Sequence, residues 1–233
     1  MLGLAPGPPR QAGVLVKPFA GKIWNKAEHS LVIQHVERME LTHYQRRLPH
    51  QLGPGASYFV TFRLAGSLPR ETVARLLEER ALRKQEPTVP DAGKRFFGAF
   101  DAVLDRASQG PCYLTNSAEA AIVRAALHFL DGPGYELLAY CIMPNHVHLV
   151  VHLPLETIAP LACTLQRLKS HTARQLNQLR ESTGQVWQRE SSDHRVRDAH
   201  ELMAIIAYTL NNPVKAGLAQ EWQQWPHSYW REP

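Results

Sequence analysis

Two strand-like runs that follow each other almost without a break constrain the fold of this chain most. Residues 135–142 and 146–153 are rich in apolar side chains, and only Met143-Pro144-Asn145 separates them. So short a connection joins neighbouring antiparallel strands, and the two runs therefore predict a β-hairpin. The turn-forming sequence Asp131-Gly132-Pro133-Gly134 marks where the hairpin begins.

Other strands and helices are predicted on either side of this hairpin. Residues 57–64, S-Y-F-V-T-F-R-L, predict a strand because they are rich in β-branched and aromatic residues. Apolar residues at helical spacing predict further elements. These are helices from Pro69 to about Leu82 and over 93–107, 117–130, 155–179 and 199–211, with a short strand at Val186-Trp187. Pro213 is predicted to end the last helix.

This order of elements predicts an α+β fold. Helices packed on one face of a mainly antiparallel sheet bury its apolar side, and a ferredoxin-like core is the simplest such arrangement. We expect residues 42–233 to form one domain with a C-terminal tail, and residues 1–41 to be a poorly patterned leader. Because Met39 directly precedes the patterned region, translation from Met39 would leave this leader outside the native protein.

Charge and cysteine content narrow the class of protein. The formal net charge is +5, which is compatible with a polyanionic partner. A nucleic acid is favoured over a membrane, because the sequence has no unbroken apolar stretch of spanning length. The three cysteines are widely spaced and odd in number, which indicates reduced thiols and a cytoplasmic protein.

His146 and His148 are the candidates for a metal site. Residues two apart on a strand share a face, so both imidazoles point the same way. Two neutral imidazoles held side by side can share one divalent ion. Spacing alone leaves open the alternative of two half-exposed histidines without a metal. We expect this face to be polar and exposed, and His152, further along it, to be structural or peripheral.

Tyr208 and Asn212 lie four residues apart in the last predicted helix, so they share a face at its C-terminal end. The tyrosine could attack phosphorus, and the amide oxygen of Asn212 could complete a metal shell. A phenol with a pKa of about 10 needs a metal or a base to activate it. The alternative is a core tyrosine followed by an asparagine C-cap and a proline that stops the helix.

Several motifs in a fixed order resemble the HUH-superfamily single-tyrosine transposases, and within them the REP-associated tyrosine transposases. The segment Tyr140–Val151, Y-C-I-M-P-N-H-V-H-L-V-V, resembles the HUH motif, in which a hydrophobic residue separates two metal-binding histidines. The resemblance covers roughly residues 43–230. Its other segments are Arg46–His50, Tyr58–Leu64, Leu168–Ala173, Val186–Glu190, Asp193–Arg197 and Tyr208–Leu218.

The resemblance implies a specific chemistry. It makes His146 and His148 metal ligands, and Tyr208 the nucleophile that forms a 5′-phosphotyrosine and leaves a free 3′-OH. The implied metal is Mg²⁺ or Mn²⁺. Asn212 would be the third ligand, although related enzymes carry a glutamine at this position. Ser191-Ser192 also departs from the family, in which aromatic residues are common there.

The implied partner is single-stranded DNA with a palindromic hairpin, bound by a monomer, with a dimer left open. Six basic residues are candidates for phosphate contacts: Arg167, Lys169, Arg174, Arg195, Arg197 and Lys215. Each alone also fits a solvated helix face. Four tryptophans could stack on unpaired bases or pack in the core: Trp187, Trp222, Trp225 and Trp230. For W-P-H-S-Y-W we expect docking of the C-terminal tail.

Two other functions fit parts of the sequence. A non-catalytic module that binds single-stranded nucleic acid would suit a ferredoxin-like sheet with aromatic residues on a strand, such as F-V-T-F at 59–62. Such a module has no reason to bring His146, His148 and Tyr208 together. A metal-dependent hydrolase that uses water would leave Tyr208 dispensable.

Overall fold

The computed structural model of the chain describes residues 44–45, 49–50, 53–69, 71–75, 78, 102–105 and 110–232. The predicted leader, residues 1–41, lies outside the described residues. Residues 71–75, 78 and 102–105 are helical, in agreement with the helices predicted after Pro69 and over 93–107. The rest of those two segments is also outside the described residues.

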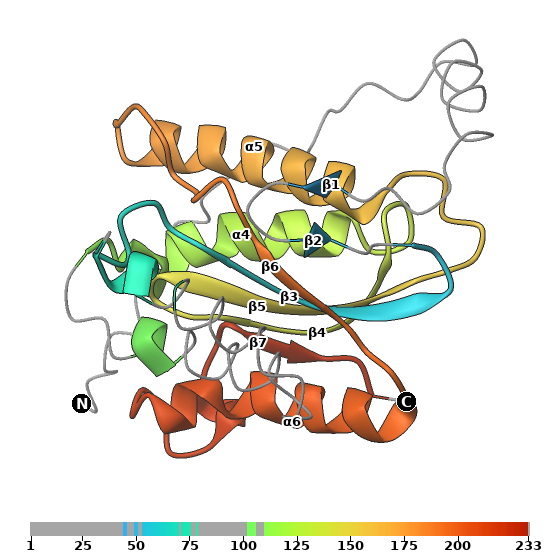
Figure 1. Ribbon diagram of the computed structural model, residues 1–233. Coiled ribbons are helices and arrows are strands. Elements are labelled where there is room, and N and C mark those ends of the chain that lie inside the picture. The colour runs from blue at the N-terminus through green and yellow to red at the C-terminus, as the bar shows by residue number, and fades with distance from the viewer. Residues whose placement is uncertain are drawn as a thin grey trace, which may run out of the picture.

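The centre of the fold is a five-stranded sheet in which every neighbouring pair of strands is antiparallel (Figure 1). Its order is β6-β3-β5-β4-β7. The predicted hairpin is confirmed as β4 and β5, with β5 in the middle of the sheet. The strands are β3 (Ala56–Arg63), β4 (Glu136–Ile142), β5 (His146–Leu153), β6 (Ser192–Arg195) and β7 (Ser228–Trp230). A separate two-stranded sheet pairs β1 (Tyr44–Gln45) with β2 (Pro49–His50).

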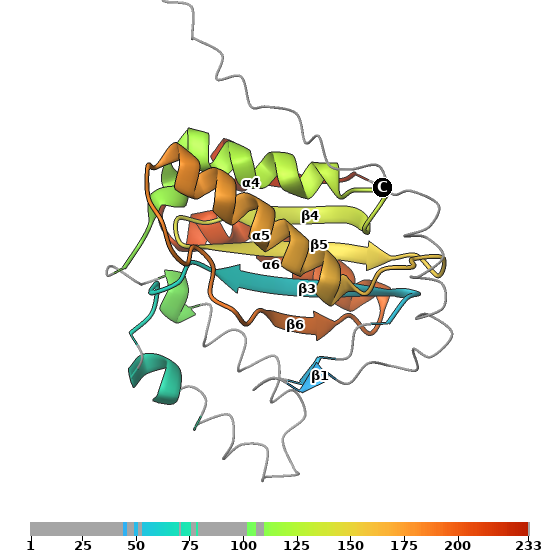
Figure 2. The same cartoon turned by 90° about the horizontal axis from the view of Figure 1, so that it is seen from above.

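Helices cover both faces of the sheet (Figures 1 and 2). Helices α4 (Ser117–Phe129) and α5 (Leu161–Leu179) pack together on one face, and α6 (Ala199–Lys215) lies on the other, so helices are not confined to one face as the sequence predicted. The succession β3-α4-β4-β5-α5-β6, with sheet order β6-β3-β5-β4, is the ferredoxin-like arrangement. The predicted α+β class is confirmed, and α6 and β7 extend this core. No helix among the described residues is long and apolar enough to cross a membrane.

Because side chains alternate along each strand, the two faces of the sheet carry two separate hydrophobic cores. On β3, Tyr58, Val60 and Phe62 belong to the large core under α4 and α5. Phe59 points the other way and belongs to a smaller core with Val150 and residues of α6. Along this second face, toward the β4–β5 turn, the strand residues become polar: Thr61, Arg63, His146 and His148, all buried. The fold therefore holds a buried polar region at one end of the α6 face.

Two predicted boundaries and one predicted strand are wrong, and one strand was not predicted. Helix α5 begins at Leu161 and not at 155, because Pro160 stands at its N-cap and disfavours helical backbone in the preceding residue. The predicted strand at Val186-Trp187 is only an isolated bridge between Leu64 and Trp187. The real strand, β6, was not predicted, because S-D-H-R has no apolar alternation and its conformation comes from pairing with β3.

The other wrong boundary is the end of α6, which continues through Pro213 to Lys215. Proline removes one backbone donor, but the helical bonds resume when the Ala216 amide donates to the Asn212 carbonyl. The helix ends at Gly217, which has φ +71°. The amides of Gly217 and Leu218 donate to the carbonyls of Val214 and Pro213, the pattern of a Schellman motif.

The C-terminal tail docks on the sheet, as predicted. Strand β7 pairs with β4, and the Trp225 indole donates a hydrogen bond to the Ile142 carbonyl over 3.0 Å. Trp222 and Trp230 pack against the smaller core, and Trp187 is buried in the larger one. The core and docking interpretation of the tryptophans therefore accounts for all four.

The Schellman motif predicts the effect of changing Gly217. Gly217→Ala should lower the free energy of unfolding by about 1–2 kcal/mol, because an L residue is strained in left-handed backbone. Nothing surrounds the position to add a steric cost. Gly217→Asn is the matched control and should lower the free energy of unfolding less, since asparagine tolerates this conformation. Urea unfolding of the two variants checks this, and equal losses would show that backbone strain is not the cause.

Candidate active site

The imidazoles of His146 and His148 face each other within the sheet–α6 layer. Their Nε2 atoms are 2.9 Å apart, and their ring centroids 4.6 Å apart. Both side chains have 0% exposure, so the expectation of an exposed polar face is wrong. They are covered because Asp105 lies against His146, while Phe59 and Tyr208 lie against the His148 ring.

Hydrogen bonds at Nδ1 fix the orientation of both rings. His146 Nδ1 lies 2.6 Å from Asn145 Oδ1, and His148 Nδ1 lies 2.9 Å from Thr61 Oγ1. When both Nδ1 atoms donate, each Nε2 keeps its lone pair toward the other ring, which is the tautomer that metal-binding histidines use. Burial lowers the pKa of His146 to about 3. Burial, with His146 and Lys215 nearby, also holds the pKa of His148 well below its usual range, so both rings are neutral.

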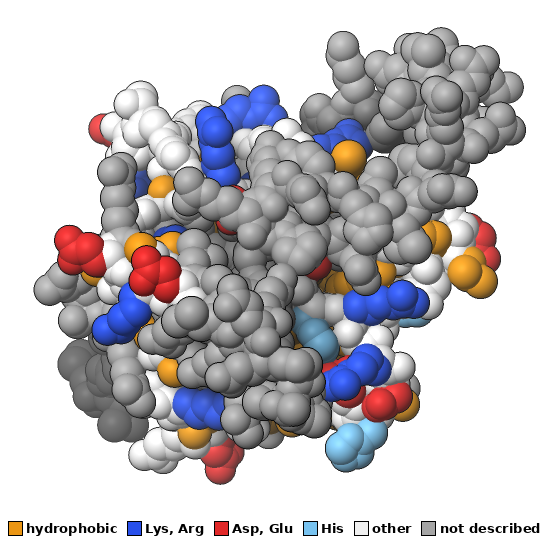
Figure 3. All heavy atoms as spheres, in the orientation of Figure 1, with side chains coloured by type: hydrophobic (Ala, Val, Ile, Leu, Met, Phe, Trp, Pro, Cys, Tyr) orange, Lys and Arg blue, Asp and Glu red, His pale blue; other side chains and the backbone are white. Residues whose placement is uncertain are grey.

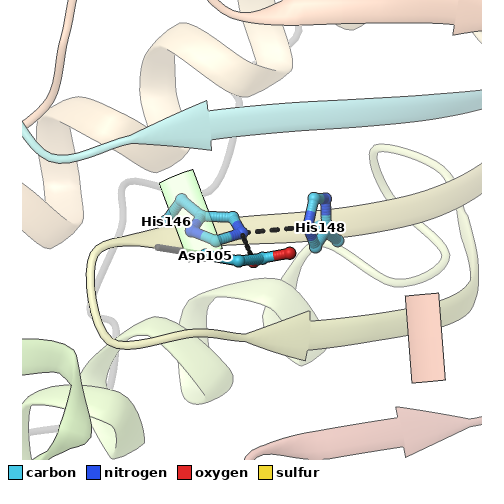
Figure 4. Close-up of side chains that lie close together, drawn as sticks. All are labelled: Asp105, His146 and His148. Carbon is cyan, nitrogen blue, oxygen red and sulfur yellow. Dashed lines mark hydrogen bonds and ion pairs between the residues drawn. The ribbon is translucent and has the colours of Figure 1, made fainter. Parts of the chain in front are cut away.

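Asp105 completes this group, and the sequence did not reveal it. Its Oδ1 is 3.7 Å from His146 Nε2, and one ligand atom from each of Asp105, His146 and His148 lies within 4.8 Å of the others (Figure 4). Burial raises the pKa of Asp105 to about 6, and Lys215 partly opposes this shift. Asn145 holds the segment in place, because its Nδ2 donates to the Leu104 carbonyl over 3.0 Å.

These donor atoms fit a divalent metal ion. Asp105 Oδ1 is buried without a hydrogen-bond partner, which a metal would supply. Two ligands at right angles around an ion with bonds of about 2.1 Å lie about 3 Å apart. The 2.9 Å between the two Nε2 atoms agrees with this separation. Two neutral imidazoles and a carboxylate are also ligands that first-row divalent ions accept.

Tyr208 meets the histidine pair from α6. Its ring centroid is 6.0 Å from that of His148 and 6.1 Å from that of Phe59. The side chain is half-buried, so it is accessible in part. The expectation that the histidine face and the tyrosine helix converge is therefore met. Tyr208 also packs against the smaller core, so the part of the alternative that made it a core tyrosine is met as well.

Asn212 lies one turn after Tyr208 and is fully buried. Its Nδ2 donates to the Tyr208 carbonyl over 3.0 Å, and its Oδ1 is buried without a hydrogen-bond partner. It is inside α6 and not at the C-cap, so the C-cap alternative is wrong. An amide oxygen with no partner, one helical turn from Tyr208, suits a ligand role, which remains a prediction.

The six predicted phosphate-binding residues do not form one patch. Lys215 lies at Tyr208, with Nζ 4.0 Å from the ring centroid. Arg197 is exposed and pairs with Glu201 near the start of α6. Arg195 points to the α5 side of the sheet, because its partner Tyr58 does. The other three are on α5: Arg167, Lys169 and Arg174. The face in Figure 3 likewise shows separate groups of basic side chains mixed with acidic ones.

Comparison with known proteins gives consistent matches. Residues 113–211, which include both histidines and Tyr208, match the family model described as "Transposase IS200 like". Over 103 residues the chain is 33% identical to a Haemophilus influenzae protein whose name assigns it to the REP-associated tyrosine transposases. That alignment covers 40% of this chain and 58% of the relative, which is less than two thirds of the relative's length.

A solved structure has the same fold. It is the structure of a REP-associated tyrosine transposase bound to a REP hairpin, with a TM-score of 0.51 and 16% sequence identity. The superposition covers 80% of this chain and 81% of the other. The resemblance noted in the sequence is found again in these matches: residues 113–211 are similar to the IS200-like transposases, and part of the chain is similar to a relative named as a REP-associated tyrosine transposase.

Proposed function

We propose that the protein is a metal-dependent tyrosine transposase that nicks and rejoins single-stranded DNA at hairpin-bearing sequences. The observation that carries the proposal is the position of Tyr208, which lies against the ring of His148 within the Asp105, His146 and His148 group. A nucleophile beside a candidate metal site is the arrangement that covalent attack on a phosphodiester requires.

Asp105, His146 and His148 would hold the ion, with Asn212 Oδ1 as a further ligand. The chemistry that Mg²⁺ or Mn²⁺ supplies at such a site is Lewis-acid polarisation of the scissile phosphate. Two imidazole ligands favour Mn²⁺ over Mg²⁺, which prefers oxygen ligands and retains water. Because both imidazoles are already neutral, they need lose no proton to bind the ion.

Tyr208 would carry the strand through the reaction. Its phenol oxygen gives up its proton and bonds to phosphorus, the bond from phosphorus to the 3′ oxygen breaks and that oxygen takes up a proton, and the 5′ end of the strand stays on the protein as a phosphotyrosine. The released 3′-OH, or another one, can reverse the step. Covalent capture conserves the phosphoester bond for rejoining, which suits strand transfer better than hydrolysis.

The DNA substrate is inferred from the relatives and the charges. The solved relative is bound to a REP hairpin, and we assign single-stranded DNA with a palindromic hairpin to this chain too. Arg195 on edge strand β6 and the basic residues of α5 lie on one side of the sheet, and Lys215 lies on the other. DNA that passes around the β6 edge would contact both groups.

The proposal also covers the oligomeric state of the protein and its cellular compartment. We propose a monomer, as the resemblance to the REP-associated branch implies. The free thiols of Cys112, Cys141 and Cys163 are consistent with action in the cytoplasm, where cysteines stay reduced. A non-catalytic binding module fits less well, because it gives no reason for two buried neutral histidines, a carboxylate and a tyrosine to converge.

Changing the metal ligands should separate binding of the ion from folding. Asp105→Asn keeps the volume of the side chain but removes its charge, so we expect a normal fold and a loss of Mn²⁺ affinity of more than about tenfold. His146→Ala and His148→Ala should abolish cleavage as well. Both histidines are fully buried, so these two should also lower stability, by about 1–3 kcal/mol.

Isothermal titration with Mn²⁺ is the measurement, and circular dichroism checks the fold. His152→Gln is the matched control, because His152 is also on β5 but bonds Ser57 Oγ at the other end of the strand. Its Mn²⁺ affinity should equal that of the wild type. Unchanged affinity in Asp105→Asn would remove Asp105 from the site and leave Asn212 as the oxygen ligand.

Tyr208→Phe should eliminate the covalent route, because it removes the attacking oxygen and almost no volume. The variant should bind hairpin DNA with near-normal affinity and salt dependence, yet form no protein–DNA adduct and no nick. Denaturing gels with end-labelled hairpin DNA and Mn²⁺ measure both products. Tyr229→Phe is the control, since Tyr229 stacks on Tyr140 on the α4 side of the sheet.

The three candidate functions give different results. Nicking that persists without an adduct in Tyr208→Phe would indicate a hydrolase that uses water. An adduct that persists would make another tyrosine the nucleophile. A wild-type protein that binds the DNA but never nicks it would be a binding module.

A further inference from the structure

Lys215 lies over the ring of Tyr208 because α6 does not stop at Pro213. Seven residues along a continuous helix return to nearly the same face, about 10.5 Å further along the axis. Helical side chains lean toward the N-terminus, so the long lysine side chain reaches back toward the tyrosine. Its Nζ is 4.0 Å from the Tyr208 ring centroid. A helix that ended before Pro213 would have no fixed place for this ammonium group.

Lys215 is exposed, and its ammonium group contacts the Tyr208 ring. No carboxylate among the described residues lies at ion-pair distance from it, and Asp105 is its electrostatic neighbour at longer range. An ammonium group on the ring of the proposed nucleophile is thus available to an anion.

We propose that Lys215 binds the scissile phosphate itself, and so differs from the other basic residues, which would contact the DNA backbone elsewhere. The inference rests on the proposed function, since it takes Tyr208 as the nucleophile. Attack brings phosphorus to within about 3–3.5 Å of the phenol oxygen. A non-bridging phosphate oxygen then comes within reach of a mobile ammonium group that already lies on the same ring.

The chemical reason for a cation at this place is the charge of the reacting group. A phosphodiester is an anion that repels an approaching phenol oxygen as negative charge develops on it. Lysine and arginine side chains near a transferring phosphoryl group stabilise charge on its non-bridging oxygens. The candidate metal site lies on the sheet side of Tyr208, and Lys215 lies on α6. The two would therefore hold the phosphate from two sides.

A double-mutant cycle between Lys215 and the phosphate tests this. The protein is the full chain with Mn²⁺, as wild type, Lys215→Ala or Lys215→Arg. The DNA is a hairpin substrate with its mapped cleavage site, carrying either a normal phosphodiester or a neutral methylphosphonate at the scissile linkage. A second modified DNA carries the methylphosphonate one linkage away. The readout is the rate of adduct formation in single turnover at saturating protein.

We expect Lys215→Ala to slow adduct formation on normal DNA by about 10²-fold, the usual effect of losing one group that stabilises charge at the reacting centre. Lys215→Arg should restore most of the rate. Methylphosphonate at the scissile linkage should slow adduct formation more in the wild type than in Lys215→Ala, because only the wild type then loses an ion pair. The modification one linkage away should slow adduct formation by the same factor in both proteins.

Arg174→Ala is the matched control, because Arg174 is an exposed cation on α5, across the sheet from Tyr208. It should change affinity and salt dependence but show no coupling to the scissile linkage. Equal methylphosphonate penalties in wild type and Lys215→Ala would overturn the proposal while leaving the nuclease intact. So would a Lys215→Ala variant with a normal saturating rate. Absence of any wild-type adduct would overturn the proposed function and this inference with it.

Discussion

The register of β5 between β3 and β4 is the constraint on which the rest of the structure depends. It sets Thr61 and Cys141 opposite His148, and Arg63 opposite His146. Because side chains alternate on a strand, a slip of one residue would exchange the large-core residues of β5 with a face that carries three histidines and Val150. The tight β4–β5 turn, in which the Met143 amide donates to the His146 carbonyl, prevents such a slip. The hydrophobic core and the histidine pair are therefore specified together.

Asn145 connects the β4–β5 turn to a segment far away in the sequence. One side of its amide accepts from His146, and the other donates to the Leu104 carbonyl, next to Asp105. The result is a buried site in which two oxygens, Asp105 Oδ1 and Asn212 Oδ1, have no partner. Unpartnered buried oxygens cost free energy, which folding tolerates where a ligand supplies the missing interaction. Among the described residues, two of the three such side-chain atoms belong to candidate ligands, and the third is Thr209 Oγ1.

Local patterns made part of this arrangement predictable. The hairpin, the shared face of His146 and His148, and the four-residue spacing of Tyr208 and Asn212 all follow from the periods of strand and helix. Asp105 was missed because no spacing rule connects it to the hairpin, and only Asn145 does. Strand β6 was missed because its polar sequence takes its conformation from β3. The burial of both histidines depends on Asp105 and α6, which strand periodicity cannot reveal.

Helix α6 carries its three functional candidates as one unit. Tyr208, Asn212 and Lys215 are four and three residues apart on a continuous helix, so their spacing is fixed by backbone hydrogen bonds. His146 and His148 belong instead to the sheet. Any displacement of α6 relative to the sheet would change the distance from Tyr208 to the histidine pair while leaving the Tyr208–Lys215 contact intact. The position of Tyr208 relative to the histidine pair is therefore set by the small core that joins the helix to the sheet, in which Phe59 and Val150 meet Ile206 and Leu210.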